Sequence, residues 1–74
     1  MTLRDCAPDA RIRIDGLSLP AGDRLRLTEL GFVRGQELRV VARGAAGGLL
    51  VALGDARIAL DADTTRGIRV SAGG

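Results

Sequence analysis

The sequence predicts a small all-β domain, a closed or nearly closed barrel of about five strands with one short helix inserted after the first strand. Three observations support this prediction: the chain has only 74 residues, its apolar runs are short and separated by turns rich in Gly, and a single stretch has helical spacing. The chain is expected to form one domain over residues 1–74, with its core over residues 3–70 and a flexible tail over residues 71–74.

The composition indicates a globular protein with a thin core. Hydrophobic residues make up 46% of the chain and charged residues of both signs 27%, so disorder is not expected. Phe32 is the only aromatic residue. All 11 basic residues are Arg, and the net charge is only +2. Because the chain has neither a basic stripe nor several aromatic residues to stack on bases, nucleic acid is not expected as a partner.

The first segment predicts a strand behind an irregular lead-in. Leu3 is expected to anchor that lead-in to the core. Residues 11–15 alternate charged and apolar side chains, which predicts a half-buried strand with Ile12 and Ile14 facing inward. Residues 16–22 contain Gly and Pro and predict a loop.

One helix and its C-terminal stop organise the chain. Asp23 is expected to be the N-cap, since its carboxylate can accept from free N–H groups of the first turn. Leu27 and Leu30 lie three residues apart, on one helical face. Gly31 can adopt the left-handed conformation that ends a helix, and Phe32 then contacts Leu27 in a Schellman motif.

A turn and a strand follow the helix. Gly35 suits the third position of a type II turn, which needs a positive φ. Residues 36–43 predict a strand in which Leu38, Val40 and Ala42 share one face.

The next residues predict a β-hairpin. Residues 44–48 are small and predict a turn. Residues 49–53 are apolar throughout, which predicts a strand buried on much of both faces. Gly54 and Asp55 form a favourable two-residue connection to an antiparallel strand over residues 56–60.

The C-terminal part predicts a helical turn and a last strand. Residues 61–65 indicate a capped single turn of 3₁₀ character, which Gly67 ends before a strand over residues 68–70. Asp61 and Asp63 could also form a carboxylate pair for ferrous iron, but the capping preference favours a helix start.

The helix and its stop also carry a family resemblance. The chain resembles the FeoA family in the run Arg26-Leu27-x-x-Leu30-Gly31-Phe32-x-x-Gly35, which is similar to that family's signature. FeoA is the small cytoplasmic partner of the bacterial ferrous iron transporter. The resemblance extends from Leu3 to Val70 and implies an SH3-type barrel with a helix after the first strand. One departure is Arg34, where the family commonly has Pro.

The resemblance implies a function as well as a fold. It implies a cytoplasmic accessory protein that binds the FeoB-type permease and carries no iron itself. The same fold occurs as the C-terminal domain of DtxR-type iron repressors, but no helix-turn-helix is readable in these 74 residues, so this domain alone is not expected to act as a repressor. A free-standing SH3-like interaction module or nucleic-acid-binding barrel is the third alternative, and self-association stays open.

The residues that most enzymes use are scarce. The chain has no His, which excludes His-based triads and the commonest general base. Cys6 is the only Cys, so it allows no internal disulfide and has no His to activate it. No phosphate-binding Gly-rich loop is present. The sequence therefore predicts no enzyme activity, no cofactor and no metal site. Since no signal peptide or apolar span is readable, a cytoplasmic location is expected.

Two pairs of residues are candidates for contact with a partner. Arg24 and Arg26 are expected near the start of the helix, where its dipole disfavours cations. They form either a solvated face, in which Arg26 pairs with Glu29, or a docking surface. Leu17 and Leu19 flank Ser18 in the loop before the helix. They either close the end of the barrel or serve as apolar anchors for a partner.

Overall fold

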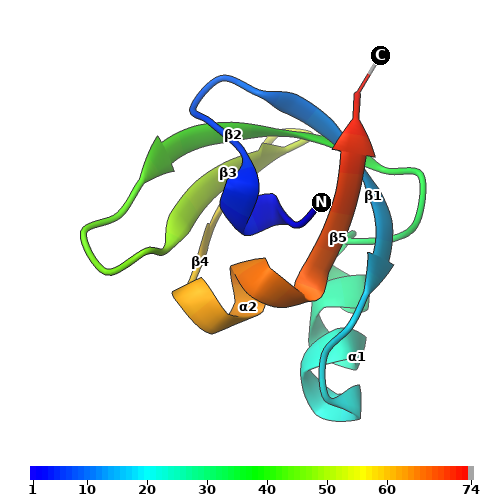
Figure 1. Cartoon of the computed structure of the whole chain (residues 1–74). Helices are drawn as coiled ribbons and strands as arrows, with labels where there is room; N and C mark the ends of the chain where they lie inside the picture. The colour runs from blue at the N-terminus through cyan, green and yellow to red at the C-terminus, as the bar shows by residue number, and fades with distance from the viewer. Residues whose placement is uncertain (74) are drawn as a thin grey trace.

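The computed structural model describes residues 1–73, and within that range five strands curl into an antiparallel sheet (Figure 1). The strands are β1 (Arg11–Leu17), β2 (Glu37–Arg43), β3 (Leu49–Leu53), β4 (Ala56–Leu60) and β5 (Ile68–Ala72). The helical elements are η1 (Leu3–Asp5), α1 (Ala21–Leu30) and α2 (Ala62–Gly67). The predicted all-β domain with a helix after the first strand is confirmed.

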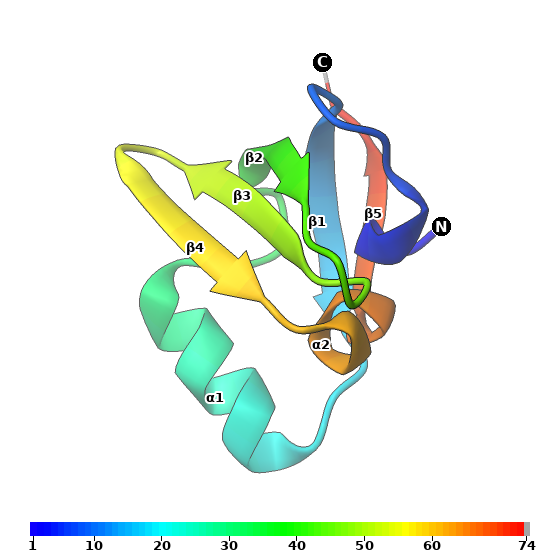
Figure 2. The ribbon, with the colours of Figure 1, turned by 90° about the vertical axis from the view of Figure 1, so that its left-hand side faces the viewer.

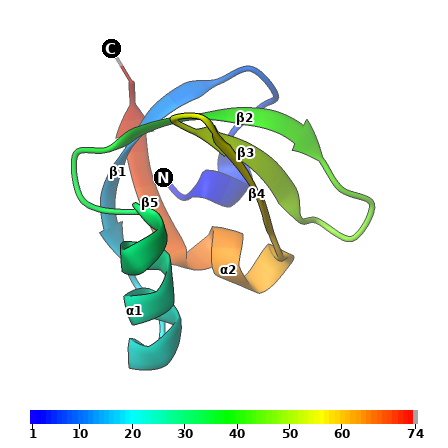
Figure 3. The ribbon, with the colours of Figure 1, turned by 180° about the vertical axis from the view of Figure 1, so that it is seen from behind.

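The sheet is a nearly closed barrel. Its strand order is β4-β3-β2-β1-β5, so β4 and β5 are the two edges. The chain crosses from one edge to the other through α2, as the view from behind shows (Figure 3). Apolar side chains from the strands, η1 and α1 fill the interior. These buried residues are Leu3, Cys6, Ile12, Ile14, Leu27, Phe32, Leu38, Val40, Leu49, Val51, Leu53, Leu60, Ile68 and Val70.

The prediction for β1 is confirmed, although the strand continues two residues further, to Leu17. Ile12 and Ile14 are buried and their neighbours are exposed. β1 lies between β2 and β5 and positions the loop that leads to α1. The lead-in is anchored as predicted, because Leu3 is fully buried.

β2 differs from its predicted pattern at one end. Leu38 and Val40 are buried as expected, but Ala42 is exposed. The pairing with β3 shifts between Val40 and Ala42, which indicates a β-bulge. The bulge breaks the alternation of faces, and the sequence gives no local signal for it.

The hairpin of β3 and β4 is confirmed. Leu53 pairs with Ala56, which leaves Gly54 and Asp55 as the two-residue connection. The prediction for β3 holds on one face only, since its first, third and fifth residues are buried and the other two are half-buried.

The C-terminal part contains more regular structure than predicted. Asp61 is the N-cap as expected, but the following turn is an α-helix, α2, and not a 3₁₀ helix. β5 continues to Ala72, so Ser71 and Ala72 belong to the strand and not to a tail. Gly74, the last residue of the expected tail, lies outside the described residues.

α1 begins three residues earlier than predicted, at Ala21 and not at Arg24. Its N-cap is Pro20, whose carbonyl oxygen accepts from the N–H of Arg24 at 2.9 Å. The prediction of Asp23 as N-cap is therefore wrong: Asp23 is the third residue of the helix. Its carboxylate still lies in the first turn, where the helix dipole favours an anion.

The predicted C-terminal stop of α1 is confirmed in detail. Gly31 has a φ of 109°. Its N–H donates to the carbonyl oxygen of Thr28 at 3.0 Å, and the N–H of Phe32 donates to the carbonyl oxygen of Leu27 at 2.9 Å. These are the two hydrogen bonds of a Schellman motif. Gly35 has a φ of 89°, and the N–H of Gln36 bonds to the carbonyl of Val33 at 3.0 Å, as a type II turn requires.

Candidate partner-binding site

α1 is the element that extends from the barrel (Figure 2). Within Ala21–Leu30 only Leu27 is buried. Leu25 and Leu30 are 61% and 51% exposed, and Val33, just after the helix, is 43% exposed. Leu30 was expected on the same face as Leu27, but the barrel covers only Leu27. A helix that exposes apolar side chains in this way is a candidate surface for a partner.

Both helix arginines of the predicted site are exposed. Because α1 begins at Ala21, Arg24 lies at the end of the first turn and Arg26 beyond it. The Nη2 of Arg26 donates to Oδ1 of Asp23 at 3.4 Å, so the expected pairing with Glu29 is wrong. The exposed pair contributes little to stability. Arg24 forms no ion pair with an acidic group of residues 1–73.

Leu17 and Leu19 are half-buried and pack against the core. Leu19 lies directly against Gly67 of α2, where a Cβ would collide with it. This packing agrees with the interpretation that both leucines close the end of the barrel. The structure therefore does not bring them onto the exposed face of α1 that carries Leu25.

Two grooves flank α1. One, of about 190 Å³, lies between α1 and β4 and is lined by residues that include Arg26, Leu30, Ile58, Leu60 and Asp61. The other, of about 290 Å³, lies between α1 and β1, and its lining includes Asp15, Leu17, Arg24, Phe32, Val33 and Arg34. Each predicted arginine thus lines a different groove.

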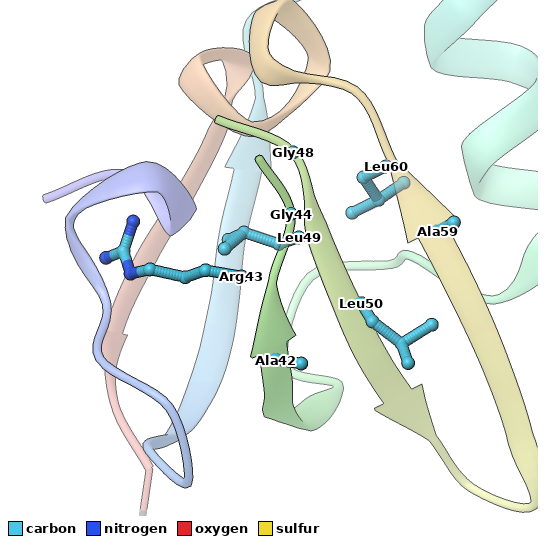
Figure 4. Close-up of a pocket in the computed structure, with 8 residues that line it drawn as sticks. All are labelled: Ala42, Arg43, Gly44, Gly48, Leu49, Leu50, Ala59 and Leu60. Carbon is cyan, nitrogen blue, oxygen red and sulfur yellow. The ribbon is translucent and has the colours of Figure 1, made fainter. Parts of the chain in front are cut away.

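A third pocket, of about 270 Å³, lies near the turn between β2 and β3, and its lining includes Ala42, Leu50 and Ala59 (Figure 4). The side chain of Arg43 extends away from it towards η1, where its Nη2 donates to the carbonyl oxygens of Arg4 at 3.1 Å and Cys6 at 2.5 Å. Arg43 therefore holds the lead-in against β2. This role has no sequence signal, because the partners are backbone atoms distant in the chain.

The other candidate ligands have structural roles. Asp61 caps α2, accepting from the N–H of Thr64 at 2.7 Å, and Asp63 accepts from Arg66 at 2.8 Å. Cys6 is buried, which raises the pKa of its thiol. Among residues 1–73, no three His, Cys, Asp or Glu residues are grouped so that they could hold a metal ion.

Asp61 makes the stability of α2 depend on pH. The hydrogen bond from the Thr64 N–H lowers the pKa of Asp61 below its ordinary value of 3.8. Its contribution to stability is therefore present above that value and is lost as the pH falls through the lower folded pKa. Asn also caps helices but does not titrate here. Urea unfolding at pH 7 and pH 3 should show a smaller acid-induced loss of stability for Asp61→Asn than for the wild type. Equal losses would contradict this role.

No helix within residues 1–73 is both long and apolar enough to span a membrane. Nor do those residues contain a charged group directed into the pocket of Figure 4 that could act as an acid or base. The feature that stands apart from the needs of the fold is α1 with its two grooves.

Comparison with known proteins identifies the fold. The FeoA of Stenotrophomonas maltophilia, solved with zinc, is 38% identical, with 96% of this chain and 89% of that chain covered and a TM-score of 0.81. It is described as a prokaryotic SH3 domain protein with a suggested role as an activating factor in ferrous iron transport. The FeoA protein of Chlorobium tepidum is 24% identical over 100% of this chain and 71% of that chain, with a TM-score of 0.92.

The fold also occurs within larger regulators. A manganese-dependent transcriptional repressor is 25% identical, with 99% of this chain but only 41% of that chain covered and a TM-score of 0.84. The comparison with curated proteins gave no match. The model of the FeoA domain matches residues 1–72. With nearly its whole length matched and an SH3-like barrel as its structure, the chain belongs to the FeoA family.

Proposed function

We propose that the protein is a cytoplasmic accessory of bacterial ferrous iron uptake that binds the FeoB-type permease through α1. Family membership and the role suggested for the Stenotrophomonas maltophilia protein support the iron transport part of this proposal. The observation that carries the docking part is the exposure of α1: Leu25 and Leu30 lie in solvent, although they are among the largest apolar side chains of the domain.

The exposed face of α1 combines the two properties that a docking helix needs. Fully burying a Leu side chain favours association by about 1.5–3 kcal/mol, so Leu25 is suited to be an anchor. Arg24 and Arg26 lie on either side of it in the sequence, and exposed charges of this kind accelerate and orient association more than they add affinity. The acidic partner surface that would complement them is expected on the GTP-hydrolysing cytoplasmic domain of the permease.

The proposed role needs no catalytic group from this chain. The chain has no His, and the thiol of Cys6 lies buried with a raised pKa. Any effect on GTP hydrolysis would therefore arise from how α1 positions the partner. A binding assay and a rate assay consequently test different parts of the proposal.

The test is calorimetric titration of the purified cytoplasmic domain of the FeoB-type permease from the same organism, with its GTPase rate followed in parallel. We expect saturable binding by the wild type and binding at least about tenfold weaker for Arg24→Glu/Arg26→Glu, because two attractive contacts become repulsive. The matched control is Arg11→Glu/Arg57→Glu, which makes the same change in net charge on exposed strand positions.

The control separates a docking surface from a general effect of charge. Equal weakening by both double variants would contradict docking through α1. No binding by the folded wild type would contradict the proposed partner. Circular dichroism checks the fold of each variant, since Arg26→Glu also places an anion beside Asp23.

A further inference from the structure

The groove between α1 and β1 contains two arginines that the fold does not use. Arg24 comes from α1 and Arg34 from the turn after it, and both line this groove of about 290 Å³. Neither guanidinium forms an ion pair within the described residues 1–73. Both are exposed. The groove therefore presents two cations whose charge is available to a ligand.

Both arginines lie where local structure favours a different residue. Arg24 is in the first turn of α1, where the helix dipole disfavours a cation. Arg34 occupies the second position of the type II turn closed by Val33 and Gln36, and Pro is favoured there because its φ is already fixed. Two independent departures from local preference thus meet in one groove, which suggests a role in binding.

The rest of the lining defines the chemistry of the ligand. Asp15 is the acidic residue of the lining, and its Oδ1 accepts from the hydroxyl of Ser71 at 3.0 Å. Because the lining has two arginines and one aspartate, its net charge is positive. Leu17 and Val33 supply apolar surface beside them. Phe32 is fully buried, so it offers no ring face on which a nucleic acid base could stack.

We propose that this groove binds an acidic segment of a partner protein, with a carboxylate between Arg24 and Arg34 and a neighbouring apolar side chain against Leu17 and Val33. The inference rests on the proposed function in taking the cytoplasmic domain of the FeoB-type permease as that partner. The planar guanidinium group binds a carboxylate through two parallel hydrogen bonds, which gives such a contact geometric specificity.

Arg34 allows an unusually clear test. Its backbone N–H donates no hydrogen bond within residues 1–73, and Pro is favoured at its turn position. Arg34→Pro should therefore unfold at a higher urea concentration than the wild type while it lacks the cation. Weaker binding by a variant that is more stable cannot be attributed to unfolding.

In the first arm of the experiment, the permease domain is titrated with the wild type, Arg24→Gln/Arg34→Pro and the control Arg11→Gln/Arg57→Gln. We expect about tenfold weaker binding for the groove variant, a weaker salt dependence, and no change for the control. Undiminished binding by the groove variant would overturn the groove proposal while the proposed function stood.

The second arm does not depend on the permease. A short capped peptide of Glu and Asp around one Leu is added to ¹⁵N-labelled protein, and the same peptide with Gln and Asn is the control. We expect amide shifts around Asp15, Arg24 and Arg34 with the acidic peptide only. Such shifts without binding of the permease domain would support the groove and contradict the proposed partner. Shifts elsewhere, or equal shifts with both peptides, would overturn the groove.

Discussion

Phe32→Ala is expected to cost about 3–5 kcal/mol of the free energy of unfolding. Phe32 is fully buried in the core, and it is the only aromatic side chain in the domain. The backbone N–H that completes the Schellman motif at the carbonyl of Leu27 is kept in the variant, so the expected loss comes from the buried ring. Because a domain of this size has a core that supplies only a few kcal/mol of net stability, the variant should be largely unfolded at room temperature.

Urea unfolding followed by far-ultraviolet circular dichroism measures this loss. Val33→Ala is the matched control, since Val33 is the next residue and is 43% exposed. We expect the control to lie within about 0.5 kcal/mol of the wild type. A difference of less than about 1 kcal/mol between the two variants would contradict the position of Phe32 at the centre of the core.

Gly31→Ala should destabilise the domain by about 1–2 kcal/mol. The φ of Gly31 is 109°, a conformation that an L-residue adopts only with strain, and a Cβ there would lie 3.1 Å from Cδ2 of Leu53. Relief of the strain would break the stop that places Phe32 in the core and Arg34 beside the groove.

The matched control for Gly31→Ala lies in the same helix. Gly22 has no atom within 4 Å of an added Cβ, and its φ is not positive. Gly22→Ala should therefore stabilise α1 by about 0.5–1 kcal/mol, because Ala loses less conformational entropy in a helix. The two substitutions should shift the urea midpoint in opposite directions. A shift in the same direction would contradict the helix bounds or the left-handed stop.

The fold was predictable where the determinants lie close together in the sequence. The stop at Gly31, the turn at Gly35 and the connection at Gly54 and Asp55 each depend on a few consecutive residues, and the structure confirms them. The alternation of Ile12 and Ile14 likewise identified β1. Membership of the FeoA family, which the helix and its stop suggested, is also confirmed.

The predictions failed where the determinants lie far apart or where two residues compete. Asp23 is a better N-cap than Pro20 by residue preference, but the carbonyl of Pro20 already begins the helix. The bulge that exposes Ala42 depends on the pairing of β2 with β3. Which of Leu27 and Leu30 is buried depends on how α1 meets the barrel.

The candidate site was predictable only in part. Arg24 and Arg26 were identified because cations are disfavoured near the start of a helix. In the sequence, Arg34 stands out only as a departure from the Pro that is common in the family, since nothing local indicates that the turn after α1 returns to the same groove as Arg24. That proximity is a property of the folded barrel.

The most direct test of docking through α1 is an amide-shift map of the ¹⁵N-labelled protein on addition of the cytoplasmic domain of the FeoB-type permease. The account predicts saturable shifts confined to α1 and the turn over residues 31–36, with neighbouring shifts in β1. Shifts centred on the β3–β4 hairpin would contradict it. So would the absence of shifts with an excess of permease domain that a separate GTP-binding assay shows to be folded.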